Sequence, residues 1–473
     1  MGRMFELGFG TTEQEVAVDR LPVEGQIPAW LRGTLVRNGP GTFQVGKERY
    51  RHWFDGLAML HRFSFQEGEV SYANRFLDCQ AYREAQETGA ISYSEFATDP
   101  RRSVLERVGT VFSPKITDSA KVSVARVAGR HLALAETPIQ VEFDPVTLAS
   151  RGTFLYEDGL MGQMTTVHPQ FDDRRDEAYN LVTRYHRVSH YNIHAVKGDG
   201  SVRRVTSLPV KKPAYMHSFG MSPTYIILTE FPLVVNPVHL LLWLRPYIEN
   251  FHWEPRRGTP FWVVNRHTGE LAGRYECDPF FAFHHVNAFE RGDELVVDLV
   301  AYEDARVLKA YYLDQLEGEQ NEIPWGTLRR YRVPLQGGRV RSELLSEVCM
   351  ELPRFDYPRY NMRAEYRFVY ASSIRPEARS GFYNQLVKAD IQTGQSWTWF
   401  ESGCYPGEPV FVGAPERRAE DEGAILSVVL DAGRGESFLL VLDAGSFAER
   451  ARARIPHPVL FGYHGEFFGS GAR

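Results

Sequence analysis

The sequence has few cysteines: four in 473 residues, at Cys79, Cys277, Cys349 and Cys404. No two of them form a Cys-x-x-Cys pair. This spacing argues against a disulfide framework and against a metal site built from thiolates. We therefore expect a protein that works in a reducing compartment, and the simplest such location is the cytoplasm.

The sequence also lacks an excess of positive charge. It has 60 acidic and 54 basic residues, a net charge of −6, and no basic stripe. Nucleic acid is therefore not an expected partner. The first residues show no basic region followed by an apolar core, so we expect no secretory signal. Glu6 stands where N-myristoylation requires Ser or Thr, so that modification is not expected either.

Helical patterns are scarce. The best candidates are residues 99–108 and 305–315, and both lie in connections between strand-like runs. Short β-rich runs recur along the chain: KVSVARV, HLALAET, EAYNLVT, YIILTE, FWVVN, ELVVDLVAY, RFVYASS, QLVKADI, AILSVVLD and SFLLVLD. Turn sequences such as GDG (198–200) and QTGQ (392–395) separate them. Many short antiparallel strands indicate a sandwich, barrel or propeller, and the length favours an all-β propeller.

Aromatic residues are abundant at 13%, with 30 Phe and 23 Tyr, which predicts apolar pockets or aromatic-rich strands. One stretch, PLVVNPVHLLLWL (232–244), is too short to span a bilayer, and Pro237 would break a long helix. With Trp243 and the following Arg245, it fits a loop or short helix that dips into one leaflet of a membrane. It fits a buried helix packed against the propeller equally well. In the first case the protein would be peripheral on the inner face of a membrane.

Four histidines lie in separate apolar contexts, and three glutamates lie in similar ones. The contexts are TTVHP (His168), AYMHSFG (His217), FAFHHVNAFE (His284), LFGYHGEFF (His464), ALAETP (Glu136), MELPRF (Glu351) and CYPGEPVF (Glu408). A buried imidazole without a partner costs roughly 1–3 kcal/mol. Four neutral imidazoles can share a transition metal, and each can donate its other N–H to a carboxylate. Each residue taken alone is more simply a core residue bonded to backbone, but the seven together favour a metal centre.

The spacing of the four histidines permits them to meet on a propeller axis. His168 and His217 are 49 residues apart, His217 and His284 are 67 apart, and His284 and His464 are 180 apart. A seven-bladed propeller of this length has about 68 residues per blade, with about four strands in each. Because the inner strands converge on the axis, ligands from different blades can reach one metal. The spacing is permissive rather than decisive.

Five blocks of sequence resemble the carotenoid cleavage oxygenase family, in the family's order and along nearly the whole chain. They are RNGPGTF (37–43), HWFDGLAMLHRFSF (52–65), AYMHSFGMSPTYIILTE (214–230), FHHVNAFE (283–290) and FGYHGEF (461–467). The first block is most similar to the animal branch, which holds β-carotene oxygenases and a retinoid isomerase. The resemblance implies one propeller domain over residues 1–473. It has seven blades and a cap of loops and helices over the active-site face, and the cap includes residues of about 232–260.

The resemblance also implies an iron(II) on the axis, one per chain, bound by His168, His217, His284 and His464. Strand alternation places His284 and His285 on opposite faces without showing which faces inward. The family pattern has Asn three residues after the ligand, and Asn287 therefore selects His284. The carboxylates that orient three of the imidazoles would be Glu136, Glu351 and Glu408, and backbone would orient His168. Zinc would also bind four imidazoles, but it would not activate dioxygen.

The resemblance predicts a dioxygenase that cleaves a carotenoid or apocarotenoid, an apolar polyene, with dioxygen as co-substrate. Phe54 and Tyr302 match positions that line the substrate tunnel in the animal branch, and ordinary core packing is the alternative for each. Stilbene-cleaving relatives have Lys before the first of these glutamates, where this chain has Ala135. The isomerase has an acylated Cys after an Asp-Pro pair, where this chain has Arg101. Stilbene cleavage, retinyl-ester isomerisation and a non-catalytic metal-stabilised propeller remain as alternatives.

Overall fold

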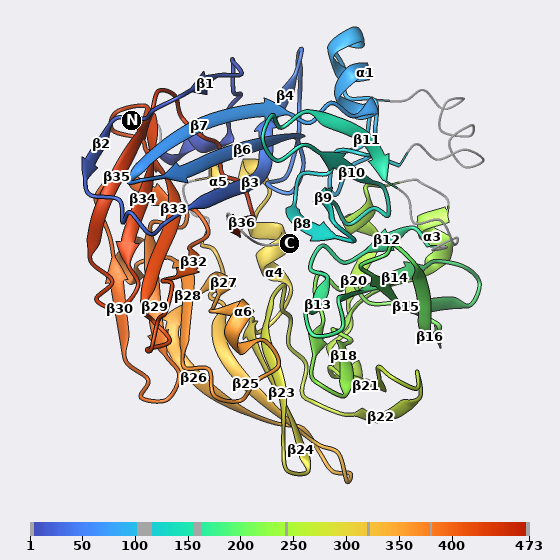
Figure 1. Cartoon of the computed structure of the whole chain (residues 1–473). Helices are drawn as coiled ribbons and strands as arrows, with labels where there is room; N and C mark the ends of the chain where they lie inside the picture. The colour runs from blue at the N-terminus through green and yellow to red at the C-terminus, as the bar shows by residue number, and fades with distance from the viewer. Residues whose placement is uncertain are drawn as a thin grey trace.

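The computed structural model describes residues 4–101, 116–154, 162–241, 245–318, 322–378 and 381–469. Within these residues, seven sheets have four or more strands, and two further sheets have two strands. The seven large sheets surround a common centre, and the chain passes round the ring once from blue to red (Figure 1). The predicted all-β, seven-bladed propeller is confirmed.

We number the blades in chain order. Blade 1 contains β1 (Ala17–Val18), β3 (Gly33–Thr42), β6 (Leu57–Gln66), β7 (Glu69–Phe76) and β36 (Gly465–Gly469). Blade 2 contains β8 (Ser123–Val127), β9 (Arg130–Leu134), β10 (Gln140–Phe143) and β11 (Ser150–Phe154). Blade 3 contains β12 (Met164–Thr165), β13 (Gln170–Asp172), β14 (Glu177–Arg184), β15 (Ser189–Lys197) and β16 (Val202–Val210).

The remaining blades follow the same antiparallel plan. Blade 4 contains β17 (Gly220–Met221), β18 (Tyr225–Thr229), β21 (Phe261–Asn265) and β22 (Leu271–Tyr275). Blade 5 contains β23 (His285–Arg291), β24 (Glu294–Ala301), β25 (Thr327–Pro334) and β26 (Arg341–Cys349). Blade 6 contains β27 (Glu351–Arg354), β28 (Phe368–Ser373), β29 (Gln385–Asp390) and β30 (Ser396–Trp399). Blade 7 contains β2 (Val23–Gly25), β31 (Cys404–Pro406), β32 (Val410–Gly413), β33 (Gly423–Asp431), β34 (Glu436–Asp443) and β35 (Glu449–Ile455).

Both ends of the chain close the ring. The C-terminal strand β36 pairs with β3 in antiparallel register, with Leu35 opposite Phe467. The N-terminal strand β2 pairs with β35, with Glu24 opposite Arg452. Blade 1 therefore takes a strand from the end of the chain, and blade 7 takes one from its beginning, so that neither blade can be completed from a continuous segment.

Apolar side chains on both faces of the strands hold adjacent blades together. Leu35 and Phe63 of blade 1 pack in one buried cluster with Leu426 and Leu439 of blade 7. Tyr179 and Ile193 of blade 3 share another with Ile226 and Val264 of blade 4. A central strand that is covered on both faces must be apolar on both, which explains continuous runs such as AILSVVLD.

Helices and small sheets lie in the connections. They are α1 (Gln80–Thr88), α3 (Pro237–Leu241), α4 (Arg306–Ala310), α5 (Leu313–Leu316), α6 (Tyr357–Tyr360), η1 (Met4–Phe9), η2 (Tyr247–Asn250), η3 (Pro255–Arg257), η4 (Pro376–Ala378), the β4 (Gln44–Val45) and β5 (Glu48–Arg49) pair, and the β19 (Leu233–Val235) and β20 (Phe251–Trp253) pair. The helix predicted over residues 305–315 is present as α4 and α5, whereas residues 102–108 of the other predicted helix lie outside the described residues.

The apolar stretch 232–244 divides into parts with different environments. Val234 and Val235 of β19 are 1% and 0% exposed, so for this part of the stretch the buried alternative holds, as a strand rather than a helix. They are buried because β19 pairs with β20 and packs into the core. Val238 of α3 is 52% exposed, and residues 242–244, including Trp243, lie outside the described residues. Among the described residues, no helix has the length and apolarity needed to cross a bilayer.

Candidate metal centre

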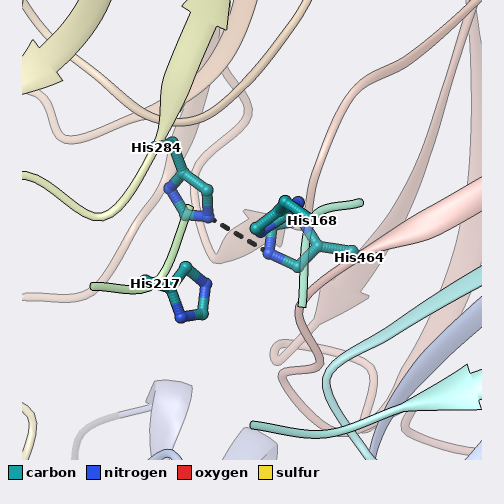
Figure 2. A group of neighbouring side chains, drawn as sticks. All are labelled: His168, His217, His284 and His464. Carbon is teal, nitrogen blue, oxygen red and sulfur yellow. Dashed lines mark hydrogen bonds between the residues drawn. The ribbon is translucent and has the colours of Figure 1, made fainter. Parts of the chain in front are cut away.

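Four blades each bring one histidine to the axis. His168 lies between β12 and β13 of blade 3, and His217 lies shortly before β17 of blade 4. His284 and His464 immediately precede β23 of blade 5 and β36 of blade 1. One ligand nitrogen from each of the four residues lies within 4.8 Å of the others, and the rings converge on a common point (Figure 2). The four histidines identified in the sequence are thus brought together.

The other three blades each bring one glutamate. Glu136 follows β9 of blade 2, Glu351 begins β27 of blade 6, and Glu408 lies between β31 and β32 of blade 7. A carboxylate can only accept, so the histidine Nδ1–H groups donate. His217 donates to Glu136 at 2.7 Å, His284 to Glu351 at 2.6 Å, and His464 to Glu408 at 2.8 Å.

These bonds determine which nitrogen of each ring is free for a metal. An imidazole that donates from Nδ1 has its lone pair on Nε2 when it is neutral. The Nε2 atoms of His284 and His464 are 3.2 Å apart, and His168 Nε2 is buried without a hydrogen-bond partner. Lone pairs that face one another at this distance repel unless a cation lies between them. The donor set therefore fits a metal ion that prefers imidazole nitrogen.

Each of the seven blades brings one residue to the axis, so three carboxylates are available to orient four histidines. In blade order the axis receives His464 from blade 1, then Glu136, His168, His217, His284, Glu351 and Glu408 from blades 2 to 7. His284 and His464 bond to glutamates from adjacent blades, whereas the bond between His217 and Glu136 passes across the blade of His168. Among the described residues, no carboxylate hydrogen-bonds to His168.

Burial keeps three of these histidines neutral. Burial, reinforced by the neighbouring imidazoles, lowers the pKa of His168 and of His464 well below the ordinary value. Burial also lowers the pKa of His217, and its bond to Glu136 opposes that shift. These three histidines therefore offer lone pairs rather than N–H groups to the axis at neutral pH.

His285 faces away from the axis. Its Nδ1 lies 2.8 Å from the Ser218 hydroxyl, and its Nε2 lies 2.8 Å from the Thr229 hydroxyl. Ser218 also donates to the carbonyl of Phe283 at 2.6 Å. These contacts join the loop of His217 to the loop of His284, so that the two histidine motifs position each other.

A large cavity reaches the four-histidine group. It encloses about 1440 Å³, including its open mouth, and His217, His284 and His464 form part of its wall. Much of the rest of the wall is apolar or aromatic: Trp53, Phe54, Phe96, Val122, Ala135, Met164, Tyr185, Leu240, Tyr247, Phe283, Tyr311, Leu352 and Tyr463. Phe54 therefore lies on the cavity. Tyr302 is not among the described residues that line the cavity.

Sequence reasoning missed the groups that hold the glutamates. The Tyr302 hydroxyl donates to Glu351 at 2.9 Å, and the Tyr215 hydroxyl donates to Glu136 at 2.6 Å. Burial raises the pKa of Glu408, and Arg354, which lies 3.7 Å from that carboxylate, offsets part of the rise. Tyr215 had a visible signal, because it lies two residues before His217 in the same motif. Tyr302 and Arg354 are distant in sequence from the glutamates that they contact, and no shared motif links them.

Comparison with known proteins agrees with this geometry. A family model described as retinal pigment epithelial membrane protein matches residues 9–469. The chain belongs to the carotenoid cleavage oxygenase family. A family member from Galleria mellonella, a carotenoid isomerooxygenase, is 34% identical over 94% of this chain and 92% of its own. A mitochondrial carotenoid-cleaving dioxygenase from Mustela putorius furo is 33% identical over 97% and 95%.

Solved structures of the family superpose on nearly the whole chain. A mutant of the Synechocystis apocarotenoid oxygenase has a TM-score of 0.89 and 25% identity, with 99% of this chain and 98% of that chain covered. The cobalt-substituted form of the same oxygenase has a TM-score of 0.88 and 26% identity over the same shares. The family therefore holds a metal within this fold, and the four-histidine group is the metal site that the family typically has.

Proposed function

We propose that the chain is a non-haem iron(II) dioxygenase that cleaves one double bond of a carotenoid or apocarotenoid to give two carbonyl products. The observation that carries this proposal is the convergence of His168, His217, His284 and His464 at the wall of a large apolar cavity. The family relationship supports it, because the similar proteins include carotenoid- and apocarotenoid-cleaving oxygenases.

Each residue of the centre has a role in this proposal. The four histidines hold the metal through their free nitrogens, and Glu136, Glu351 and Glu408 fix three ring orientations through the Nδ1 bonds. Iron(II) bound there would supply the redox chemistry that activates dioxygen. The aromatic wall, with Phe54 and Phe283 beside the histidines, holds the polyene by apolar contact and excludes water from the bond that is cut.

Two of the alternatives are disfavoured by the cavity. A purely structural metal site is coordinatively closed, whereas three of these histidines face an open cavity. Ala135 lines the cavity where stilbene-cleaving relatives have Lys, so the phenol contact that they use is missing at that position.

The test combines metal content with product analysis. Purified protein loaded with iron(II) should contain one iron per chain and should convert an apocarotenoid into two carbonyl products. Under oxygen-18 dioxygen, both products should carry the label. Products without label, or conversion of a retinyl ester without oxygen uptake, would favour an isomerase and contradict the proposal.

We also propose that α3 docks on a membrane surface, from which an apolar substrate enters. Leu240 and Arg245 line the cavity, and Val238 and Arg245 are exposed, so apolar and cationic groups occur together at one part of its rim. An apolar helix face with a neighbouring Arg fits the interface between acyl chains and lipid phosphates.

Substitution of two α3 side chains, the exposed Val238 and the half-buried Leu240 on the cavity wall, tests this docking. Val238→Glu with Leu240→Glu should lower binding to liposomes and slow cleavage of a membrane-dissolved carotenoid, with a smaller effect on a detergent-solubilised apocarotenoid. Val146→Glu is the matched control, because Val146 is 67% exposed on the β10–β11 turn of another blade. Equal liposome binding by the double variant and the control would contradict membrane docking through α3.

A further inference from the structure

A buried ion pair interrupts the apolar wall of the cavity. The Lys121 ammonium lies 2.5 Å from Glu95 Oε2, and the two side chains are 5% and 2% exposed. Thr117 donates to the other oxygen of Glu95 at 2.7 Å. Lys121, Glu95 and Thr117 all line the cavity. Removal of two charges from water is expensive, and a buried ion pair is weak evidence for stability, so this pair calls for an explanation other than folding.

The hydrogen bonds of Lys121 are incomplete. A lysine ammonium has three N–H donors. Lys388, another buried lysine, uses all three, on Asp421 at 2.6 Å and on the carbonyls of Ala444 and Gly445 at 2.8 and 2.7 Å. Among the described residues, Lys121 has one acceptor, Glu95. Two of its donors therefore remain for a group inside the cavity.

The backbone next to Lys121 adjoins the metal centre. The carbonyl of Val122 accepts the backbone N–H of His464 at 3.2 Å. Among the described residues that line the cavity, Arg245 is the one lysine or arginine besides Lys121, and Arg245 is exposed. The described wall of the cavity therefore has one buried ammonium, that of Lys121.

We propose that Lys121 hydrogen-bonds an oxygen atom at one end of the substrate, a carbonyl or hydroxyl of an oxygenated apocarotenoid, and thereby sets which double bond lies at the metal. This inference rests on the function proposed above. A polyene in an apolar cavity has no directional contact, so displacement by one double bond changes its burial little. A charge-assisted hydrogen bond at one end is directional, and it makes one register more stable than the others. Glu95 holds the ammonium in place.

Ala135 alone does not make the cavity wall free of polar groups. It stands next to Glu136, where stilbene-cleaving relatives have Lys. The structure shows an ammonium on the same cavity wall that comes from the start of blade 2, immediately before β8. Although position 135 has no Lys, the cavity therefore has a group that can hydrogen-bond to an oxygen atom of a ligand.

Binding and product identity test the proposal separately. The ligands are an apocarotenoid with a terminal aldehyde or alcohol and a hydrocarbon with the same polyene. Under anaerobic conditions, Lys121→Met should weaken binding of the oxygenated ligand by roughly 10–100-fold, the range of a hydrogen bond to a charged group. Affinity for the hydrocarbon should change much less. In air, the wild-type protein should cut the oxygenated ligand at one double bond, whereas Lys121→Met should give a mixture of products.

Two further variants separate positioning from folding. Lys121→Met leaves Glu95 buried without its cation, so Lys121→Met with Glu95→Gln removes the pair together and should show the same loss of selectivity. Lys388→Met is the matched control: it should lower thermal stability while it leaves the single product pair unchanged. The proposal is overturned if both Lys121 variants fold, prefer the oxygenated ligand as strongly as the wild type does, and give the same single product pair. Cleavage of a hydroxystilbene but of no polyene, lost on Lys121→Met, would instead overturn the proposed function and support the oxygen contact.

Discussion

Individual side chains at the axis differ in what their loss should do, and His284 and His285 show the contrast best. His284→Ala should remove one metal ligand and abolish stoichiometric iron binding and turnover, while the fold remains. His285→Ala should retain iron but lose the contacts to Ser218 and Thr229, at a cost of about 1–3 kcal/mol in the free energy of unfolding. Metal analysis and denaturant titration of both variants distinguish these outcomes. Full iron content in a folded His284→Ala protein would contradict the ligand assignment.

The carboxylates act on the metal through the imidazoles. Glu351→Gln and Glu408→Gln keep the side-chain shape but remove the charge that accepts the Nδ1–H, so we expect about a 10–100-fold loss in metal affinity or activity. Glu420→Gln is a suitable control, because Glu420 accepts the backbone N–H groups of Arg367 and Phe368 away from the axis. Iron titration measures the effect. If Glu351→Gln and Glu408→Gln both bind iron with wild-type affinity, the proposed role of the two carboxylates is contradicted.

The sequence allowed prediction of the seven axial residues but not of their complete surroundings. Apolar contexts identify buried polar residues, and that criterion pointed to the three glutamates and to His168, His217 and His464. The choice of His284 over His285 needed the family pattern around Asn287. The apolar contexts did not predict the hydrogen bond between Tyr302 and Glu351. The two residues are 49 apart in sequence, and their contact depends on how blades 5 and 6 meet. The same criterion did not find Lys121 either, because KVSVARV is an ordinary strand sequence until Glu95 is placed beside it.

At the scale of elements, His52 joins the cavity wall to α4. Its Nε2–H donates to the carbonyl of Leu308 at 2.8 Å, and its Nδ1 accepts from the backbone N–H of Phe54 at 3.0 Å. The bond from Phe54 requires the neutral ring, because a protonated ring has no acceptor at Nδ1. Burial lowers the pKa of His52 to about 3. Between pH 3 and pH 6.5 the unfolded chain therefore binds more protons at this residue than the folded chain does.

This difference makes stability depend on pH. The free energy of unfolding should fall as the pH decreases from about 6.5 towards 3, since protons favour the unfolded state in that window. His52→Gln keeps a donor and an acceptor but cannot titrate, so its melting temperature should fall less steeply with acidification. Thermal melts at a series of pH values measure both slopes. Parallel curves for the two proteins would show that His52 does not contribute.

Element boundaries were predictable where one pattern dominated. The ten β-rich runs correspond to strands such as β8, β24 and β34, because β-branched and aromatic residues continue through each of them. The pairing of β36 with β3 was not predictable, since no local pattern states which distant strand lies alongside. Residues 305–315 read as one helix but form α4 and α5, with Tyr311 and Tyr312 between them.

At the scale of the whole molecule, a metal held by the four histidines would connect blades that otherwise meet through side-chain packing and hydrogen bonds. A metal that binds only the folded state stabilises it by roughly 4 kcal/mol when its free concentration is 1,000 times the dissociation constant. Because the ligands come from blades 1, 3, 4 and 5, we expect chelation to lower the stability of the entire ring in a single transition. Calorimetry with and without a chelator measures this. Two separate transitions, of which only one responds to chelation, would contradict the expectation.

The position of His464 has a consequence for biosynthesis. This histidine immediately precedes β36, the strand that completes blade 1 with β3 from the start of the chain. During translation this ligand is made only after the other three and after the strands of blades 2 to 7. A nascent or truncated chain that stops before His464 therefore has at most three of the four imidazoles. Tight metal uptake thus reports that β36 has been made and has paired with β3.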